Sequence, residues 1–434
     1  MEPKHKSNGV QNKFPFPGIP VISDGSEAIA RVESQIAEGG FTHPITPSGN
    51  MWKSFINESK KNPAKNIFIQ ETSSPADAAS ACEGFALAGG RAVSFTSGDE
   101  LAAMKEKMFS IAGKRLPVII HVGSRALTSH SMTDMCSHDD VMSVSDCGWG
   151  MLFAKNVQEA VDFAVIARRA AEESYTPFLN IQDGFLTTHK EEKFKCPETD
   201  LIRAFNGNTK DKLVNLFNPQ SPVMTGAHQG SESFMKGKIA QRDYYEKLPS
   251  VLKAAMDEFH KLTGRRYDFI EKYLPDAAEH VIIGLGSGIE EVKRYCENLD
   301  NNTGVISISV FRPFPVSELI DALKNIKAIT VIERTDNPLD FCNPLTKDIK
   351  CAIADAVMDK QITVFPEIYS CTYGLGGGKL SENEITSIIG NMKTGGKRNY
   401  SIGVEHSYSI DVPEIEPVAE FSYRDELISE KENG

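Results

Sequence analysis

Short runs of apolar residues alternate with amphipathic segments along the first half of the chain. Four of the runs have the length and the largely apolar character of strands buried on both faces, at residues 67–70, 92–96, 117–122 and 177–181. The segments between them repeat apolar residues at helical spacing, at residues 76–87, 101–112 and 157–173. Strand, loop and helix therefore follow one another at βαβ intervals, which predicts a parallel sheet with helices on both faces.

A helix and a short strand precede these runs. Helical spacing of the apolar residues between positions 28 and 37 predicts a helix that Asp24 or Ser26 caps and that Gly39-Gly40 ends. Residues 41–43 are then expected to form a strand that leads into a polar loop.

A second set of apolar runs predicts a second α/β unit. Its strands are expected at residues 280–285, 304–310, 328–333 and 362–365, with a helix that starts at Ile289. Gly286 and Gly288 allow a tight turn before this helix. However, Ile289 stands where the third glycine of the dinucleotide fingerprint belongs, so the support for an NAD site is weak.

The patterns divide the chain into five predicted parts. These are an N-terminal arm (1–22), a first α/β domain (23–262), a connector (263–276), a second α/β domain (277–403) and an acidic C-terminal tail (404–434). Within the first domain, the polar residues 190–250 predict an irregular excursion, and a helix at 248–262 closes the domain.

The composition narrows the class of protein. A chain of 434 residues with 40% hydrophobic and 24% charged residues is typical of an ordinary globular protein. The formal charge of −12 argues against nucleic-acid binding, and no apolar run approaches the ~18 residues of a membrane span. The polar start of the chain is unlike a signal peptide, so we expect a cytoplasmic protein. The eight cysteines include no CxxC pair, and we expect reduced thiols rather than a zinc ribbon or an iron–sulfur cluster.

The loop FTHPITPSGNM (41–51) is the first candidate for chemistry. Pro44 and Pro47 hold His43 and Thr46 extended, and they do so just after a strand, where α/β folds place ligands. The same residues also suit an ordinary turn, so a binding role and a structural role both stay open.

Arg125 is the second candidate, because it follows the strand predicted at 117–122. A guanidinium at this edge can bind a small carboxylate or form a structural ion pair. The loop SHSMTDMCSHDD (129–140) follows it, but its histidines lack a helical HxxxH spacing and we predict no metal site. The chain also lacks a phosphate loop and the Gly-Asp-Gly…Asn clamp for Mg²⁺ and a diphosphate. From the residues alone, we expect two α/β domains with an anion-binding cleft that works with partners.

Taken together, the motifs closely resemble the first two domains of the pyruvate:ferredoxin (flavodoxin) oxidoreductases, members of the 2-oxoacid:ferredoxin oxidoreductase family. The resemblance extends from about residue 23 to residue 403. Its markers include HPITPSGNM (43–51), NIFIQ (66–70), EGFALAGGRAVSFTSG (83–98), KRLPVIIHVGSRAL (114–127), SHDDVMSVSDCGWGML (137–152), PFLNIQDGFLTTH (177–189), VFRPFP (310–315), VIERTDNP (331–338) and YGLGGGK (373–379).

The resemblance implies a fold, an activity and partners. The first domain is expected to be of the parallel α/β type that binds the pyrimidine ring in thiamine enzymes, and the second to resemble the C-terminal domain of transketolase. The family oxidises a 2-oxoacid with CoA, using thiamine diphosphate and Mg²⁺ and passing electrons through iron–sulfur clusters. The resemblance thus implies a hetero-oligomer in which a β-type subunit brings the diphosphate-binding domain, and γ-type and ferredoxin-like subunits bring the clusters.

The resemblance also assigns site residues by position. It implies that Thr46 and Arg125 hold the substrate carboxylate. It further implies four residues that contact the cofactor, namely Ile45, Pro47, Ser97 and Gly98.

One position departs from the family pattern. The family glutamate that donates to the pyrimidine ring aligns with Pro75, which cannot relay a proton, and Glu71 is a weak catalytic candidate in its place. The pair Asp99-Glu100 adds negative charge where the family has small neutral residues.

Two hypotheses remain open at this stage. The first is an active α-type subunit of a 2-oxoacid:ferredoxin oxidoreductase. The second is a catalytically degenerate paralogue that serves as a structural, docking or regulatory subunit of a larger redox complex.

Overall fold

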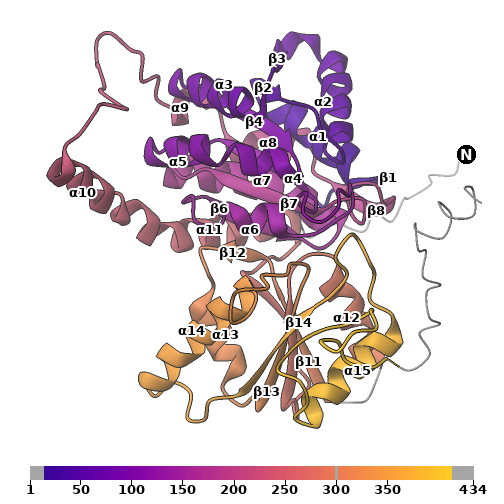
Figure 1. The fold of residues 1–434 in the computed structure, drawn as a ribbon. Helices are drawn as coiled ribbons and strands as arrows, with labels where there is room; N and C mark the ends of the chain where they lie inside the picture. Colours follow the sequence, from indigo (N-terminus) through magenta and orange to yellow (C-terminus); the bar gives the residue numbers. More distant parts are fainter. Residues whose placement is uncertain (1–13, 299–301, 413–434) are drawn as a thin grey trace, which may run out of the picture.

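The computed structural model describes residues 14–298 and 302–412. Most of the predicted N-terminal arm and of the acidic tail lies outside the described residues. Figure 1 shows two α/β domains, the first above the second, joined along a broad contact.

The first domain is built on a seven-stranded sheet. The strand order is β12-β6-β7-β5-β4-β2-β3. Neighbouring strands are parallel except for β12, which pairs antiparallel with β6 although it comes from the second half of the chain. The bounds are β2 (Gly39–Thr42), β3 (Phe68–Glu71), β4 (Ala92–Thr96), β5 (Ile119–Ser124), β6 (Gly150–Ala154), β7 (Phe178–Asp183) and β12 (Val310–Arg312).

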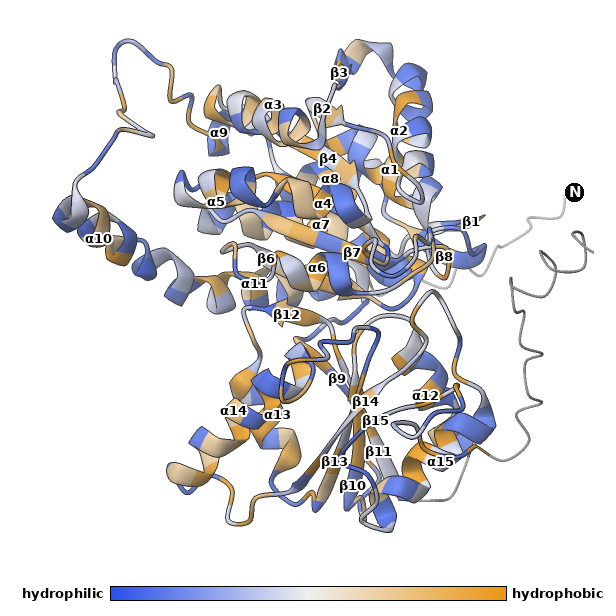
Figure 2. Ribbon diagram, viewed as in Figure 1, coloured by the Kyte–Doolittle hydropathy of each residue, from blue (hydrophilic) through white to orange (hydrophobic). Residues whose placement is uncertain are grey.

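Helices cover both faces of this sheet, as the apolar pattern predicted. One face packs on α3 (Pro75–Leu87), α4 (Gly98–Ala103), α5 (Lys105–Gly113) and α6 (Asp139–Ser143). The other face packs on α1 (Gly25–Ile36), α2 (Gly49–Lys61), α7 (Val157–Ser174), α8 (Thr199–Asn206) and α11 (Arg242–Thr263). Figure 2 shows the apolar residues on the central strands and the polar residues on the outer helix faces.

Polar side chains cap the first turns of two helices in the first domain. Asp24, one of the two caps that the sequence offered, caps α1 by accepting a hydrogen bond from the amide of Glu27 at 2.8 Å. Asn156 caps α7 in the same way, accepting from the amide of Glu159 at 3.0 Å. Such caps satisfy backbone donors that the helix itself cannot pair.

The second domain has a six-stranded sheet in the order β15-β14-β13-β10-β11-β9. Its strands are β9 (Ile270–Tyr273), β10 (His280–Gly284), β11 (Thr303–Ile308), β13 (Ala328–Glu333), β14 (Glu367–Thr372) and β15 (Asn399–Ser401), and only β9 runs antiparallel. One apolar cluster joins this sheet to α12 (Gly288–Asn298) and α15 (Glu382–Lys393). The opposite face packs on α13 (Val316–Leu323) and α14 (Pro344–Met358), in a core continuous with that of the first domain.

Three expectations about the elements were wrong. Gly39-Gly40 does not end the first helix, since α1 ends at Ile36 and these two glycines begin β2. The strand predicted at 362–365 is not formed; residues 363–365 are exposed, and the strand that pairs with β13 is β14, which starts after Pro366. Proline lacks the amide that a central ladder needs, which accounts for the later start. Residues 190–250 are also less irregular than expected, since they include β8 (Glu192–Cys196), which pairs antiparallel with β1 (Ile19–Ser23).

Three short elements have not yet been named. They are η1 (Pro63–Lys65), α9 (Thr209–Lys212) and α10 (Ser231–Ala240). Among the residues that the structure describes, no helix is both long and apolar enough to cross a membrane.

Candidate functional site

The candidate residues gather at one edge of the first sheet. The loop with Thr46 follows β2, Ser97 and Gly98 follow β4, and Arg125 follows β5. Because β2, β4 and β5 are parallel neighbours, their carboxyl ends meet at the same edge. The sequence-predicted residues on these three strands are therefore brought together.

A buried carboxylate, Asp140, organises this edge. Its Oδ2 accepts from the amides of Gly98 at 2.8 Å and Arg125 at 2.9 Å, and its Oδ1 accepts from the amide of Val141 at 2.8 Å. Burial nevertheless raises the pKa of Asp140 to about 7, because desolvation outweighs the three hydrogen bonds. Gly98 has φ +54°, and a Cβ there would lie 3.1 Å from Cδ of Arg125. A glycine at this position thus lets the loop after β4 lie against the arginine.

The guanidinium of Arg125 is held in place by main-chain carbonyls. Nη1 donates to the carbonyl of Thr46 at 3.0 Å, and Nε donates to the carbonyl of Thr133 at 3.1 Å. Arg125 is 5% exposed, whereas Thr46 is exposed at the surface of the loop. Nη1 also lies 3.0 Å from Oδ1 of Asp134, whose side chain is 54% exposed. The expected neighbours Thr46 and Arg125 therefore do meet, but a carboxylate of the chain itself already faces the arginine.

Three residues predicted to contact the cofactor, Ser97, Pro47 and Ile45, hold the Thr46 loop in place. Ser97 is buried, and its Oγ accepts from the amide of Ser48 at 3.2 Å. Pro47 is buried against Gly123 and Gly184, where a Cβ would lie 3.2 Å and 2.9 Å from its Cγ. Ile45 is half-buried, and its carbonyl accepts from Oγ of Ser48 at 3.1 Å. The loop is thus held rigidly over the edge of the sheet.

Glu71 lies opposite Thr42, at the start of the loop with Thr46, but away from Arg125. It ends β3, the edge strand, which is three strands away from β5 and so about 14 Å away at ~4.8 Å per strand. Its Oε1 accepts from Nε1 of Trp52 at 2.7 Å. Pro75 is the first residue of α3, directly after the cap Ser74, and offers neither a proton nor an amide. The structure therefore does not bring Glu71 close to Arg125.

A further acidic residue at this edge is Glu100, in the first turn of α4. Its Oε1 lies 3.5 Å from Nε2 of His43, its side chain is 15% exposed, and its Oε2 is buried without a hydrogen-bond partner among the described residues. Burial raises the pKa of Glu100 despite the attraction of His43 and Arg125. Nδ1 of His43 donates to the carbonyl of Thr72 at 2.9 Å, which leaves Nε2 facing Oε1 of Glu100. The sequence shows Glu100 only as part of an unusual acidic pair, because its contact with His43 forms between the first turn of α4 and the loop after β2.

A second buried carboxylate, Asp183, joins the two domains. Its Oδ1 accepts from Nε2 of His138 at 2.9 Å, and its Oδ2 accepts from the amide and Oγ of Ser287 at 2.9 and 2.7 Å. These hydrogen bonds and the nearby guanidinium of Arg334 outweigh burial and hold the pKa of Asp183 far below its usual range. Cys136 lies close enough to form a possible metal-ligand group with His138 and Asp183. However, donors already occupy both carboxylate oxygens, and burial raises the pKa of the Cys136 thiol, so the group is explained as a domain contact.

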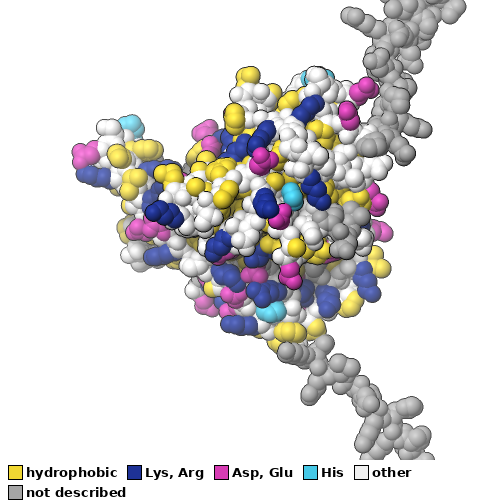
Figure 3. Space-filling model, turned by 90° about the horizontal axis from the view of Figure 1, so that it is seen from below, with side chains coloured by type: hydrophobic (Ala, Val, Ile, Leu, Met, Phe, Trp, Pro, Cys, Tyr) yellow, Lys and Arg dark blue, Asp and Glu magenta, His cyan; other side chains and the backbone are white. Residues whose placement is uncertain are grey.

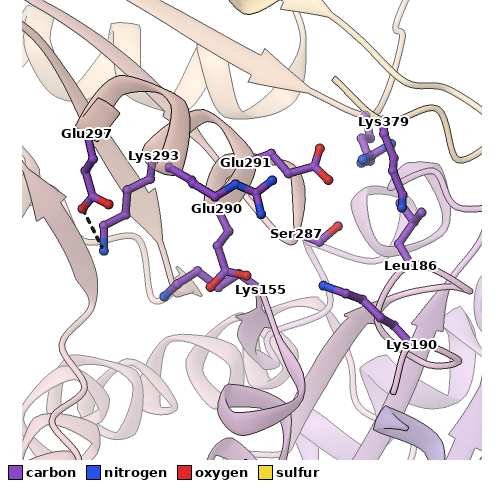
Figure 4. A pocket seen from close by; sticks show the side chains of 11 residues that line it. Lys155, Leu186, Lys190, Ser287, Glu290, Glu291, Lys293, Glu297 and Lys379 are labelled. Carbon is purple, nitrogen blue, oxygen red and sulfur yellow. Dashed lines mark ion pairs between the residues drawn. The ribbon is translucent and has the colours of Figure 1, made fainter. Parts of the chain in front are cut away.

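A cavity of about 340 Å³ lies between the domains, away from the residues predicted from the sequence. Figure 4 shows charged side chains of both signs around it. Most are paired locally; for example, Lys293 lies 2.6 Å from Glu271 and 3.8 Å from Glu297. The residues that line the cavity are Lys155, Leu186, Lys190, Ser287, Glu290, Glu291, Lys293, Arg294, Glu297, Arg334 and Lys379. This mosaic of charges selects no single ligand class.

Comparisons with known proteins agree with the resemblance drawn from the motifs. The family model for pyruvate flavodoxin/ferredoxin oxidoreductase, thiamine diphosphate-binding, matches residues 36–257, and that for pyruvate:ferredoxin oxidoreductase core domain II matches residues 278–385. The pyruvate:ferredoxin oxidoreductase of Moorella thermoacetica is 31% identical over 88% of this chain and 33% of its own. A pyruvate-flavodoxin oxidoreductase of Nostoc sp. (PCC 7119) is 32% identical over 89% of this chain and 97% of its own. The chain thus spans about a third of the length of the first curated relatives.

A solved structure confirms the expected fold class. The 2-oxoglutarate:ferredoxin oxidoreductase from Magnetococcus marinus, with 2-oxoglutarate, coenzyme A and succinyl-CoA bound, superposes with a TM-score of 0.63. The match covers 86% of this chain and 65% of the other at 16% identity, which establishes similarity of fold alone.

Proposed function

This chain belongs to the pyruvate flavodoxin/ferredoxin oxidoreductase family, and we propose that it is the α-type subunit of a 2-oxoacid:ferredoxin oxidoreductase. It contributes the pyrimidine-side half of a thiamine diphosphate site and the substrate carboxylate site for CoA-dependent oxidative decarboxylation. The observation that carries the proposal is the buried guanidinium of Arg125, fixed by the carbonyl of Thr46 at the carboxyl edge of the sheet. A guanidinium held in this way binds a small carboxylate without first being ordered.

The residues at this edge fit the pyrimidine half of the cofactor. The half site needs a carboxyl that can donate to a ring nitrogen, and position 75 cannot supply it. Glu100 can, because its Oε2 is buried without a partner and its raised pKa favours the protonated form that donates. We therefore assign to Glu100, with His43 behind it, the proton-holding role first considered for Glu71.

Each part of the chain then has a distinct task. Arg125 and the hydroxyl of Thr46 bind and orient the carboxylate of the 2-oxoacid. Ile45, Pro47, Ser97 and Gly98 shape the wall beside the ring, and Glu100 holds a proton at Oε2. Thiamine diphosphate, when bound, supplies the nucleophilic carbon that adds to the 2-oxo group.

Partner chains complete the proposed enzyme. The described residues offer no counterpart of the diphosphate clamp, so a β-type subunit contributes that clamp together with Mg²⁺. CoA is the co-substrate that takes the acyl group. Iron–sulfur clusters in γ-type and ferredoxin-like partners take the two electrons, as expected for a hetero-oligomer that acts on a small 2-oxoacid.

Substitution of Arg125 by glutamine in the assembled complex tests the proposal. Loss of a charge-assisted pair costs ~1.5–3 kcal/mol, so the KM for pyruvate is expected to rise about 10- to 150-fold. Arg398→Gln is the matched control, because Arg398 pairs with Glu367 on the surface of the second domain and is expected to leave KM unchanged. An unchanged KM in Arg125→Gln excludes the carboxylate role.

The second candidate is a non-catalytic subunit that serves as a structural, docking or regulatory part of a redox complex. Two observations favour it: Pro75 stands where the family carries its glutamate, and Asp134 already faces the guanidinium of Arg125. Under this alternative, the complex keeps its full activity in Arg125→Gln and Thr46→Ala variants, because its active sites lie in other chains.

A further inference from the structure

Asp140 differs from the acidic side chains at the surface of the molecule. Figure 3 shows such side chains on one face, interspersed with Lys and Arg. Asp140, in contrast, is 0% exposed, and among the described residues it accepts its hydrogen bonds from three backbone amides rather than from a cation. Burial of a carboxyl group without a paired cation is costly, and such groups cluster at functional sites.

The amides that Asp140 binds lie where two neighbouring strands separate. The paired register of β4 and β5 ends at Thr96 and Val122. Just beyond it, the amides of Gly98 and Arg125 donate to the same oxygen of Asp140, Oδ2, at 2.8 and 2.9 Å. Gly98 is also the first residue of α4, so its amide has no acceptor within that helix. One carboxylate oxygen therefore joins the ends of β4 and β5.

These two hydrogen bonds set the position of the Arg125 guanidinium. The bond from the amide of Arg125 fixes the main chain from which its side chain starts. The bond from Gly98 fixes the backbone against which the aliphatic part of Arg125 lies, because a Cβ at Gly98 would be 3.1 Å from Cδ of the arginine. Only from this position does the guanidinium reach the carbonyls of Thr46 and Thr133. A displacement of Asp140 would therefore move both supports of Arg125.

The second domain holds in place the segment that leads to this carboxylate. Oγ of Ser137 and the amide of His138 both donate to the carbonyl of Arg334, at 2.6 and 2.8 Å. Oγ1 of Thr335 donates to Oδ1 of Asp139 at 2.7 Å. A residue that orients a binding group must itself be held, and these contacts with the loop after β13 provide that support.

We propose that Asp140 is a positioning residue for the substrate carboxylate, because it holds the main chain at Arg125 and Gly98 so that the guanidinium is ordered before the 2-oxoacid binds. Asp140 acts through backbone amides and does not touch the substrate. A binding group that is ordered in advance loses less entropy when it binds, so loss of Asp140 weakens binding although Arg125 is still present. This inference rests on the proposed function, because it assigns the residue that orients the arginine of that site.

The test is a double-mutant cycle on the complex purified through a tag on this chain. The side chain in Asp140→Asn has the shape of the original but a single acceptor oxygen, so it cannot pair all three amides. We expect the KM for pyruvate to rise about tenfold in this variant. In the Arg125→Gln background, the same substitution is expected to change KM less than about twofold, because the group that Asp140 positions is already gone.

Asp162→Asn is the matched control. Asp162 is also 0% exposed in the first domain, and it accepts from Nε and Nη2 of Arg265 and from the hydroxyl of Tyr267, none of which belongs to the candidate site. The melting midpoint of this variant is expected to fall at least as far as that of Asp140→Asn, because it breaks a buried ion pair, whereas its KM is expected to stay unchanged.

Hydrogen exchange of the isolated chain supplies a readout that needs no turnover. Peptides that contain the amides of Gly98 and Arg125 are expected to exchange faster in Asp140→Asn than in the wild type or in Asp162→Asn. Unchanged exchange at these amides overturns the inference. So does an unchanged KM in Asp140→Asn, or a rise that is equally large in the Arg125→Gln background, when Arg125→Gln itself raises KM. If Arg125→Gln leaves KM unchanged while these amides exchange faster in Asp140→Asn, the proposed function is contradicted and the positioning contact is supported.

Discussion

If Arg125 binds the substrate carboxylate, Asp134 competes with the substrate for its guanidinium. Its Oδ1 lies 3.0 Å from Nη1 of Arg125, so a 2-oxoacid must displace this carboxylate before it binds. Asp134→Asn removes the charge and keeps the shape of the side chain. The guanidinium stays in place, because the carbonyls of Thr46 and Thr133 still hold it.

The size of the effect follows from exposure. The side chain of Asp134 is 54% exposed, and exposed ion pairs are worth ~0.2–1 kcal/mol. We therefore expect KM for the 2-oxoacid to fall about 1.5- to 5-fold in Asp134→Asn, with kcat unchanged, since the competition affects binding alone. The gain is expected to shrink at high ionic strength, because salt screens the pair that the wild type must break.

The assay is steady-state turnover of the tag-purified complex with pyruvate at two salt concentrations. Asp99→Asn is the matched control: Asp99 accepts from the amide and Oγ1 of Thr128 at 3.1 and 2.8 Å, so it anchors the same loop. An unchanged or raised KM in Asp134→Asn, or an equal fall in Asp99→Asn, refutes the competition.

The remaining predictions concern proton positions and folding. Asp183→Asn is expected to cost ~3–5 kcal/mol of unfolding free energy in urea titrations at pH 7, because it breaks a buried charged cluster. The pKa of Asp183 is depressed in the folded state, so its contribution to stability is complete above the unfolded-state pKa of ~3.9 and is lost as the pH falls below that value. The loss of unfolding free energy in Asp183→Asn is therefore expected to be constant from pH 5 to 8. A loss that grows on acidification contradicts a charged Asp183 in the folded protein. Glu100→Gln is expected to lower turnover about 10²-fold or more, whereas Glu71→Gln is expected to leave turnover unchanged. A larger loss of turnover in Glu71→Gln than in Glu100→Gln points to Glu71 as the proton donor. Pro75→Glu is expected to raise thiamine-dependent turnover, since it adds a second carboxyl proton donor at the position where the family has its glutamate, and the first turn of α3 accommodates a carboxylate. No gain, with silent Thr46→Ala and Arg125→Ala variants, supports the non-catalytic candidate.

The parts of the fold that depend on local pattern could be predicted from the sequence. Apolar runs identified β2, β3, β4, β5 and β7 of the first sheet and β10, β11 and β13 of the second, but not β6, and Asp24 is one of the two caps that the sequence offered for α1. The strand β14 was placed too early, because the run at 362–365 is more apolar than the sequence EIYSCT that forms it. The return of β12 to the first sheet could not be predicted, since antiparallel pairing with β6 joins residues more than 150 positions apart.

The site residues also divide into those that the sequence could identify and those that it could not. Thr46 and Arg125 could be identified because each follows a predicted strand, and neighbouring parallel strands bring their loops together. Asp140 and Glu100 could not be assigned roles, because their contacts with Gly98, Arg125 and His43 join separate elements of the chain and depend on burial. Glu71 was proposed for its closeness to Pro75 in sequence, but it ends the edge strand, away from β5.

The most direct test of the central claim is the thiamine diphosphate content of the complex purified through a tag on this chain. If this chain forms half of the thiamine diphosphate site, we expect about one cofactor per chain, and we expect Glu100→Gln to lower this occupancy while Glu71→Gln does not. A complex that contains the partner chains but no thiamine diphosphate contradicts the account, and it assigns this chain a role in assembly instead.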